Sequence, residues 1–417
     1  MTATEATLPP TSEIVDGLLA ELFFTPDGRA DPYPRYTQIR DRSRVHRSLL
    51  GFVVVNRYAD CLFVLRDPRL GKGNGFNAIN EVSAEVAEAA AYLRSRPRSL
   101  LEMDPPDHTR LRTLVSKAFT PRTVEQLRPH VIRLVDDTLD RFDTSPGAET
   151  DIVSELAVPL PVTVIGELLG IPEADRPLFT PWVRAATALL EMQVEAPALV
   201  AAAAANRQME EYFVELLRER RAQPGEDLLS ELLAVEDGGD ALAEDELIET
   251  AILLFGAGFE TTSNLIGNGL LALLTHPEEL ARLRADRSLM RTAIEELLRY
   301  DSPVQVDGRM AFEDVEIDGC RVEAGSQLVT LIGAANHDPS HFADPDRLDI
   351  ARDEGPPLSF GSGIHYCLGA ALARLEGQVV FDRLLDRFSR IELATDAVAR
   401  RSSLTLRGLA ALPVHLA

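Results

Sequence analysis

A cysteine lies in a glycine-rich stretch directly before a predicted helix. Residues 358–369 read LSFGSGIHYCLG, and the alanine-, leucine- and arginine-rich segment 370–388 that follows is typical of a helix. Glycines allow a tight turn and close approach of the backbone to another group. Unpaired N–H groups and the helix dipole favour a thiolate at Cys367, which would act as a nucleophile or a metal ligand. The alternative is a buried free cysteine.

A second candidate site lies in the long apolar segment 244–275, which predicts a helix buried in the core. Glu260 and Thr261 are adjacent polar residues near its centre. A carboxyl group can relay protons from solvent and a hydroxyl group can hold an ordered water, so this pair is suited to proton delivery. In the structural alternative, Glu260 bridges helices and Thr261 bonds back to a backbone carbonyl.

Two further helical pairs carry charge. His108 and Arg112 are spaced i,i+4 after a predicted helix start, and Glu296 and Arg299 are spaced i,i+3 in the predicted helix 290–300. Cations on one helix face can meet carboxylates that would otherwise be costly to bury. Both pairs are also common on solvated helix surfaces, so neither is specific alone.

The glycine–cysteine stretch resembles the haem-ligand signature of the cytochrome P450 family at every fixed position. That signature is Phe-Gly-x-Gly-x-His-x-Cys-x-Gly, matched here by Phe360, Gly361, His365, Cys367 and Gly369 with one further glycine. The resemblance implies that Cys367 is the axial thiolate on the iron of haem b (iron protoporphyrin IX). It also implies that Phe360 lies against the porphyrin and His365 near a haem propionate. Thiolate ligation favours O–O cleavage.

The helix 244–275 resembles the oxygen-activation segment of the same family. The matching residues are 257–261, which implies that Glu260 and Thr261 deliver protons and that Ala257 leaves room for oxygen beside the haem. The stretch 104–112 resembles the family helix that binds the propionates. His108 and Arg112 then hold them, with Arg309 as a third residue.

The Glu-x-x-Arg pair resembles the scaffold of that family. The resemblance implies a buried network behind the haem, formed by Glu296, Arg299 and a downstream arginine, for which Arg347 occupies the matching position. The candidate substrate contacts are Val304 and Gln305, beside the haem, and Leu404 and Thr405, at the tip of a final hairpin over 404–408.

The bulk composition limits the partners. The 417 residues carry a net charge of −24, which argues against a general nucleic-acid binder and against binding to an anionic membrane. Three widely separated cysteines suit a reducing cytoplasm. The sequence contains no apolar run long enough to predict a membrane span and no predicted signal peptide. We therefore expect a cytoplasmic protein of the soluble bacterial type.

The fold that the resemblance implies is mainly α with a minor β region, the cytochrome P450 fold in a single large domain. We expect a flexible N-terminal tail over 1–20 and a haem-binding monooxygenase domain over 21–417. Helical patterns cover 58–65, 80–96, 124–142, 159–169, 172–190, 199–220 and 226–235, and the valine-rich segment 45–56 predicts a hairpin.

The implied activity is insertion of one oxygen atom from O2 into a small apolar organic substrate, by hydroxylation or epoxidation. The pocket segments are largely apolar or small, which suggests a polyketide, terpenoid or steroid. Electrons would come from a separate ferredoxin and ferredoxin reductase, and we expect docking on a basic patch of Arg110, Arg112, Lys117, Arg122 and Arg374. The alternatives are a peroxide-dependent peroxygenase and a non-catalytic haem sensor or carrier; the intact Glu260–Thr261 pair argues against both.

Overall fold

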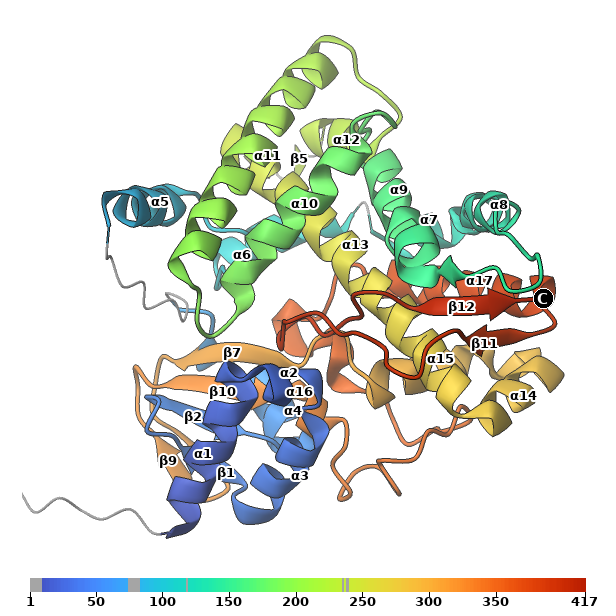
Figure 1. Cartoon of the computed structure of the whole chain (residues 1–417). Helices are drawn as coiled ribbons and strands as arrows, with labels where there is room; N and C mark the ends of the chain where they lie inside the picture. Colours follow the sequence, from blue (N-terminus) through green and yellow to red (C-terminus); the bar gives the residue numbers. More distant parts are fainter. Residues whose placement is uncertain (1–9, 74–82, 118, 235, 238–239) are drawn as a thin grey trace, which may run out of the picture.

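A computed structural model describes residues 10–73, 83–117, 119–234, 236–237 and 240–417. Most of the described chain is helical (Figure 1). The helices are α1 (Pro10–Phe24), α2 (Pro26–Ala30), α3 (Tyr33–Arg42), α4 (Tyr58–Arg66), α5 (Ala84–Ser95), α6 (Asp107–Ser116), α7 (Pro121–Gln126), α8 (Arg128–Leu139), α9 (Pro159–Leu168), α10 (Arg176–Ala186), α11 (Ala196–Ala222), α12 (Leu228–Ala234), α13 (Glu244–Thr275), α14 (Pro277–Ala285), α15 (Met290–Tyr300), α16 (Ile332–Ala335) and α17 (Ala370–Arg387). Among the described residues, we find no helix with the length and apolar character that crossing a membrane requires.

The β region is small. The strands are β1 (Val45–Arg47), β2 (Phe52–Val55), β3 (Leu70–Gly71), β4 (Thr150–Asp151), β5 (Glu236–Asp237), β6 (Asp240–Ala241), β7 (Val306–Ala311), β8 (Val315–Ile317), β9 (Cys320–Val322), β10 (Gln327–Leu331), β11 (Ile391–Leu393) and β12 (Pro413–Leu416). The largest sheet has the order β1-β2-β10-β7-β3, with β2 and β10 parallel and the other neighbours antiparallel. The prediction of a mainly α fold with a minor β region is therefore confirmed.

The N-terminal segment differs from the prediction. The flexible tail expected over 1–20 is wrong for residues 10–20, because these belong to α1; residues 1–9 lie outside the described residues. Val15, Leu19 and Leu22 of α1 are fully buried in one apolar cluster with Ile39 of α3 and Phe52 of β2. The apolar face of α1 is thus part of the core, and the predicted domain boundary at residue 21 falls inside a helix.

Prolines explain two further differences. The helix predicted over 124–142 is divided into α7 and α8, and Pro129 lies in the first turn of α8. Proline lacks an N–H group and favours a helix start, so a second helix begins there. Pro177 likewise lies in the first turn of α10, which begins at Arg176 rather than at residue 172. The residues 404–408, predicted as a hairpin, lie at the tip of a turn whose two arms meet at an isolated antiparallel bridge between Arg400 and Leu409, and a second bridge joins Leu406 to Val304.

The helix α13 crosses the centre of the molecule (yellow in Figure 1) and has the predicted bounds. Its residues belong to both large apolar clusters, with Phe255 in one and Leu265 in the other. A Cβ atom on Gly269 would lie 2.9 Å from Phe381 of α17, so this glycine permits close packing of the two helices. Most of the residues of α13 are therefore buried in the core.

A carboxyl group is buried in α17 without a charged neighbour. Glu376 is 1% exposed, and its Oε2 atom has no hydrogen-bond partner among the described residues. Burial raises the pKa of this carboxyl from 4.5 to about 8, because the charged form loses its hydration. Glu376 is therefore protonated in the folded protein at neutral pH.

We expect Glu376→Gln to raise the free energy of unfolding at pH 7 by about 3 kcal/mol, and to have almost no effect at pH 4.5. The folded carboxyl holds its proton between its two pKa values while the unfolded one has lost it. The stability that the protonated Glu376 carboxyl gives the fold is therefore fully present below the unfolded pKa. It is lost as the pH rises toward the folded pKa, whereas an uncharged glutamine keeps it. Urea unfolding of both proteins at the two pH values measures the difference, and an equal difference at both would contradict the prediction.

Candidate active site

The loop before α17 is held by buried polar side chains. The Asn336 amide donates hydrogen bonds to the hydroxyls of Ser302 (2.7 Å) and Ser359 (2.9 Å), and its oxygen accepts one from the N–H of Leu358 (2.8 Å). Further along, the N–H of Cys367 donates to the carbonyl of Phe360 at 3.0 Å. The loop is thus closed on itself and tied to the end of α15, which fixes the position of the Cys367 sulfur.

Gly363 is required by both conformation and space. Its φ is 69°, and an added Cβ atom would lie 2.4 Å from the Leu65 carbonyl oxygen. We expect Gly363→Ala to lower the free energy of unfolding by about 1–3 kcal/mol. Gly17→Ala in α1 is the control, because open space surrounds that position and alanine favours a helix; it should raise stability by about 0.5–1 kcal/mol. Urea unfolding tests both signs, and a neutral Gly363→Ala would be the contrary result.

The Cys367 thiol differs from the sequence-based expectation. The hydrogen bond from the backbone of Gly369 and the charges of Arg112 and Arg374 favour the thiolate, as predicted. Burial outweighs them, however, so the pKa of the thiol is raised rather than lowered. A buried thiolate here needs a further positive charge, and a metal ion bound at the sulfur provides one because it deprotonates a coordinating thiol.

Four predicted residues gather beside this loop. The His108 and His365 rings lie 4.3 Å apart between centroids. His108 is 2% exposed, and neither of its ring nitrogens nor Nε2 of His365 has a hydrogen-bond partner among the described residues. Arg112 lies close enough to lower the pKa of His108, and burial together with Lys72, Arg309 and His108 lowers the pKa of His365 to about 3. These residues fit the two propionates of a haem.

Sequence reasoning missed two residues of this cluster. Asp307 of β7 accepts a hydrogen bond from Lys72 Nζ (2.6 Å) and another from Arg309 (2.6 Å), and its pKa is held far below the usual range by these two cations. Lys72 follows β3, and β3 pairs with β7. No periodicity in the sequence marks Lys72 or Asp307, because the pairing of two distant strands brings them together.

The predicted basic patch is less basic than its sequence suggested. Arg110 forms an ion pair with Glu246 of α13, and Arg374 forms one with Glu295 of α15. Arg374 also lies over the Phe360 ring, 4.4 Å from its centroid. Two of the five predicted cations are therefore bound to acidic partners, and Arg374 orients the aromatic ring beside the cysteine loop.

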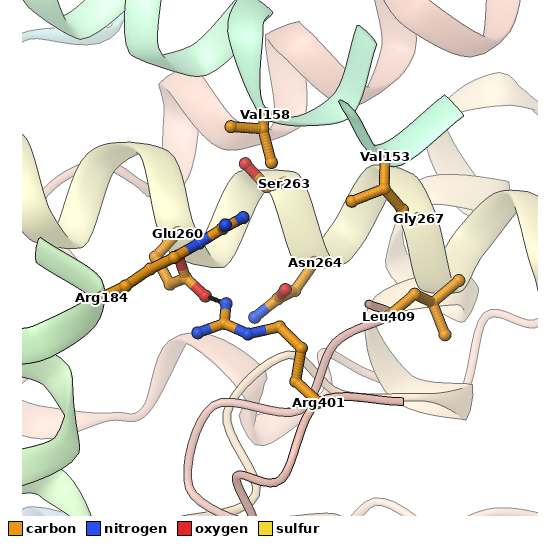
Figure 2. A pocket seen from close by; sticks show the side chains of 9 residues that line it. All are labelled: Val153, Val158, Arg184, Glu260, Ser263, Asn264, Gly267, Arg401 and Leu409. Carbon is orange, nitrogen blue, oxygen red and sulfur yellow. Dashed lines mark ion pairs between the residues drawn. The ribbon is translucent and has the colours of Figure 1, made fainter. Parts of the chain in front are cut away.

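The structure contains one part of the structural alternative for α13, the bond from Thr261 back to a carbonyl, whereas Glu260 pairs with a loop residue rather than bridging two helices. The hydroxyl of Thr261 donates to the carbonyl of Ala257 (2.8 Å), and Ala257 is exposed although it lies in the central helix. Glu260 is 1% exposed and forms an ion pair with Arg401 of the C-terminal loop (Figure 2). Arg184 lines the same pocket, and Arg184 is exposed, so this pocket lies between Glu260 and a surface side chain.

The scaffold contains the predicted pair but a different arginine. Arg299 forms two hydrogen bonds with the Glu296 carboxylate (2.7 and 2.9 Å), and both side chains are 1% exposed. The prediction for Arg347 is wrong, because its side chain is exposed and only its carbonyl accepts from Arg299 (3.2 Å). Arg352 is instead the downstream arginine of the network, because its Nε lies 3.1 Å from Oε2 of Glu296. The chain turns back after Arg347, and this turn decides which arginine points inward.

Most of the predicted substrate contacts are engaged with protein. Gln305 is fully buried; its oxygen accepts from the Tyr36 hydroxyl (3.0 Å) and its nitrogen donates to the Ser302 carbonyl (2.7 Å). The prediction that Gln305 contacts substrate is therefore wrong for this structure. Leu404 is buried, and the Thr405 hydroxyl donates to the Leu190 carbonyl at 3.0 Å. Val304 is half-buried.

The comparisons with known proteins all point to one family. The sequence model of the family described as Cytochrome P450 matches residues 75–406. Cytochrome P450 107B1 of Saccharopolyspora erythraea is 42% identical over 395 residues, covering 92% of this chain and 95% of that protein. The polyketide biosynthesis cytochrome P450 PksS of Bacillus subtilis is 39% identical over 411 residues, covering 95% and 100%.

A solved structure extends the likeness to three dimensions. P450BioI, in complex with an acyl carrier protein ligated to hexadec-9Z-enoic acid, has a TM-score of 0.85 at 37% identity, covering 94% of this chain and 100% of that chain. The predicted fold is therefore confirmed. Members of this family act with haem, O2, an organic substrate and redox partners. The chain belongs to the cytochrome P450 family and is a haem-dependent monooxygenase.

Proposed function

We propose that this monooxygenase holds haem b through Cys367 and inserts one oxygen atom from O2 into an apolar molecule of the polyketide type. The observation that carries the proposal is the buried cluster of cations and unpartnered imidazoles beside the Cys367 sulfur. Iron protoporphyrin IX matches this cluster, because its iron can bind the thiolate and its two carboxylates can accept hydrogen bonds from the cations and imidazoles. Haem held by a thiolate supplies the chemistry that cleaves the O–O bond.

We expect the loop before α17 and the helix α6 to bind different parts of the haem. Cys367 would ligate the iron, and Phe360 would pack its ring against the porphyrin. The glycines of the loop let the backbone approach the group closely, since a Cβ atom on Gly369 would meet open space. The residues proposed for cofactor binding are His108, Arg112, Ala257, Arg309, Phe360, Gly361, His365, Cys367 and Gly369.

Glu260 and Thr261 are proposed to deliver protons. Glu260 takes up a proton at its carboxylate from the pocket that Arg184 and Arg401 line. The Thr261 hydroxyl, which now donates to the Ala257 carbonyl, can rotate to hold a water on the side of the helix where Ala257 leaves room. The two groups are neighbours in the sequence of α13 but lie on different sides of the helix, so a short chain of ordered waters would have to connect them.

Electrons are proposed to come from a separate ferredoxin and its reductase. The partner would bind the face around the cysteine loop, which includes Arg112 and the exposed Arg122. The substrate class rests on the apolar pocket segments and on the relative whose name assigns it to polyketide biosynthesis. The cytoplasmic location predicted from the sparse cysteines stays a prediction.

The test begins with substrate binding by the haem-loaded protein. The probes are a polyketide macrolactone, testosterone, limonene and hexadec-9Z-enoic acid, the last both free and attached to an acyl carrier protein. We expect the macrolactone to change the iron spin state at the lowest concentration. Turnover with isotope-labelled O2, ferredoxin, reductase and NADPH should then add one labelled oxygen atom to the product.

Two results would favour the alternatives instead. Product formation with hydrogen peroxide but not with the reductase chain would identify a peroxygenase. Substrate binding without turnover under either condition would identify a sensor or carrier. A preference for the acyl carrier protein form of the fatty acid would keep the monooxygenase but overturn the polyketide assignment.

A further inference from the structure

The loop 401–405 connects Glu260 to the segment that follows α10. We propose that Arg401 is a positioning residue for the Glu260 carboxylate, and that Glu191 keeps Arg401 in place by binding this loop. The inference rests on the proposed function, since it concerns the group proposed to take up protons. It adds two residues that lie outside the glycine–cysteine loop and outside α13.

The first observation is the environment of Glu260. Arg401 of the C-terminal loop points toward the Glu260 carboxylate and forms the ion pair, and Arg184 of α10 lines the same pocket (Figure 2). The Arg401 side chain is 22% exposed whereas that of Glu260 is 1% exposed, so the pair joins a buried carboxylate to a partly exposed cation. A buried carboxylate that keeps its charge needs such a partner, and the partner fixes its rotamer.

The second observation is the binding of the loop by one carboxylate. Glu191 accepts a hydrogen bond from the Ser403 hydroxyl (2.5 Å) and others from the N–H groups of Thr405 (3.2 Å) and Leu404 (3.4 Å). The Ser403 oxygen also accepts from the N–H of Leu406 (3.0 Å), which closes the turn. Glu191 directly follows the 3₁₀ turn Thr187–Leu190, so it is joined to α10 by a single turn.

The other side of the loop is fixed to the chain near β7. The Gln305 N–H donates to the Thr405 carbonyl (3.1 Å), and the Arg407 N–H donates to the Pro303 carbonyl (2.9 Å). On the α10 side the loop is held by the three hydrogen bonds to Glu191 and by the one from the Thr405 hydroxyl to the Leu190 carbonyl (3.0 Å), so Glu191 supplies most of the contacts that determine how the loop lies relative to α10. Burial and the nearby Arg184 lower the pKa of Arg401 to about 10, against the opposing effect of Glu191, so the guanidinium is still charged at neutral pH.

The consequence is a link between α10 and proton delivery. A change at Glu191 moves the loop, the loop carries Arg401, and Arg401 sets the direction of the Glu260 carboxylate. Without Arg401 the carboxylate samples other rotamers and aligns less often with the water proposed at Thr261. Misalignment of a proton donor by about 1 Å is enough to reduce a rate strongly.

The test uses the haem-loaded full chain and a probe that needs no substrate. Infrared spectroscopy of the reduced protein under carbon monoxide measures the C–O stretching band, which depends on the electric field beside the iron. The variants are Arg401→Gln, Glu191→Gln, Ser403→Ala and Glu260→Gln. Ser402→Ala is the matched control, because Ser402 is the exposed neighbour of Ser403 in the same loop.

We expect the first three variants to shift this band in the same direction as Glu260→Gln, and Ser402→Ala to leave it unchanged. Arg401→Lys should return the band most of the way to the wild-type position. In the Glu260→Gln background, Arg401→Gln should add no further shift. In turnover, Arg401→Gln should release more peroxide and lower coupled product formation about tenfold, with little change in substrate affinity.

Two different failures can be separated. The positioning role of Arg401 is overturned if Glu260→Gln shifts the band but Arg401→Gln does not. It is also overturned if Arg401→Gln shifts the band equally in the wild-type protein and in the Glu260→Gln variant. In both cases the proton-delivery proposal stands. If Glu260→Gln changes neither the band nor peroxide release, both proposals fall. If Arg401→Gln behaves as expected but Glu191→Gln and Ser403→Ala do not, the part assigned to Glu191 is wrong.

Discussion

Replacing Cys367 by serine is expected to remove the thiolate spectrum of the haem and to reduce substrate oxidation to the background of free haem. A serine hydroxyl at this position cannot become an anion near neutral pH, so it is a weak ligand and donates little electron density to iron. Serine preserves the shape of the loop, in which the Cys367 N–H bonds the Phe360 carbonyl. Absorption spectra and turnover of the purified variant measure both effects.

Cys320→Ser is the control for this substitution. Cys320 is a free, partly exposed cysteine in β9, on the hairpin with β8, and the loop before α17 does not include it. We expect Cys320→Ser to keep both the spectrum and the activity of the unchanged protein. If Cys367→Ser also kept them, Cys367 would be a buried structural cysteine and another residue would hold the iron.

Replacing Arg299 by leucine is expected to lower the free energy of unfolding by about 3–5 kcal/mol. The substitution leaves the buried Glu296 carboxylate with one of its two arginines, Arg352, and it removes the donor to the carbonyls of Asn336 (2.8 Å) and Pro345 (2.7 Å). Because Asn336 holds the loop before α17, the variant should also bind haem less tightly. Urea unfolding and the amount of haem retained after purification measure these effects.

The chain offers an exposed pair with the same spacing as a control. Glu215 and Arg218 are also spaced i,i+3, and both side chains are more than half exposed. Arg218→Leu should change stability by less than about 1 kcal/mol, since solvent screens the charges. Equal losses for Arg299→Leu and Arg218→Leu would mean that the Glu296–Arg299 pair contributes no more than a surface pair.

The sequence predicted those features that depend on short segments. The bounds of α13 and α15 follow from long apolar or amphipathic patterns, and the structure has the same bounds. The cysteine loop could be found because its fixed residues lie within ten positions. His108 and His365 were identified separately, each from its own local motif. Their ring contact is a tertiary feature that neither motif contains.

The errors of prediction arise where tertiary structure decides. Arg347 and Arg352 are both arginines in one irregular segment, and only the path of the backbone determines that Arg352 meets Glu296. Gln305 was expected beside substrate, but Tyr36 from the N-terminal region takes its amide oxygen. The raised pKa of Cys367 is also of this kind, because burial depends on the whole fold whereas the helix dipole can be inferred from the neighbouring residues.

The central claim is that Cys367 binds haem iron as a thiolate. The most direct measurement is the absorption spectrum of the haem-loaded protein, reduced with dithionite under carbon monoxide. We predict a Soret band at the strongly red-shifted position typical of thiolate ligation. A band at the ordinary position of imidazole-ligated haem, or no haem band after expression with added haem, would contradict the claim.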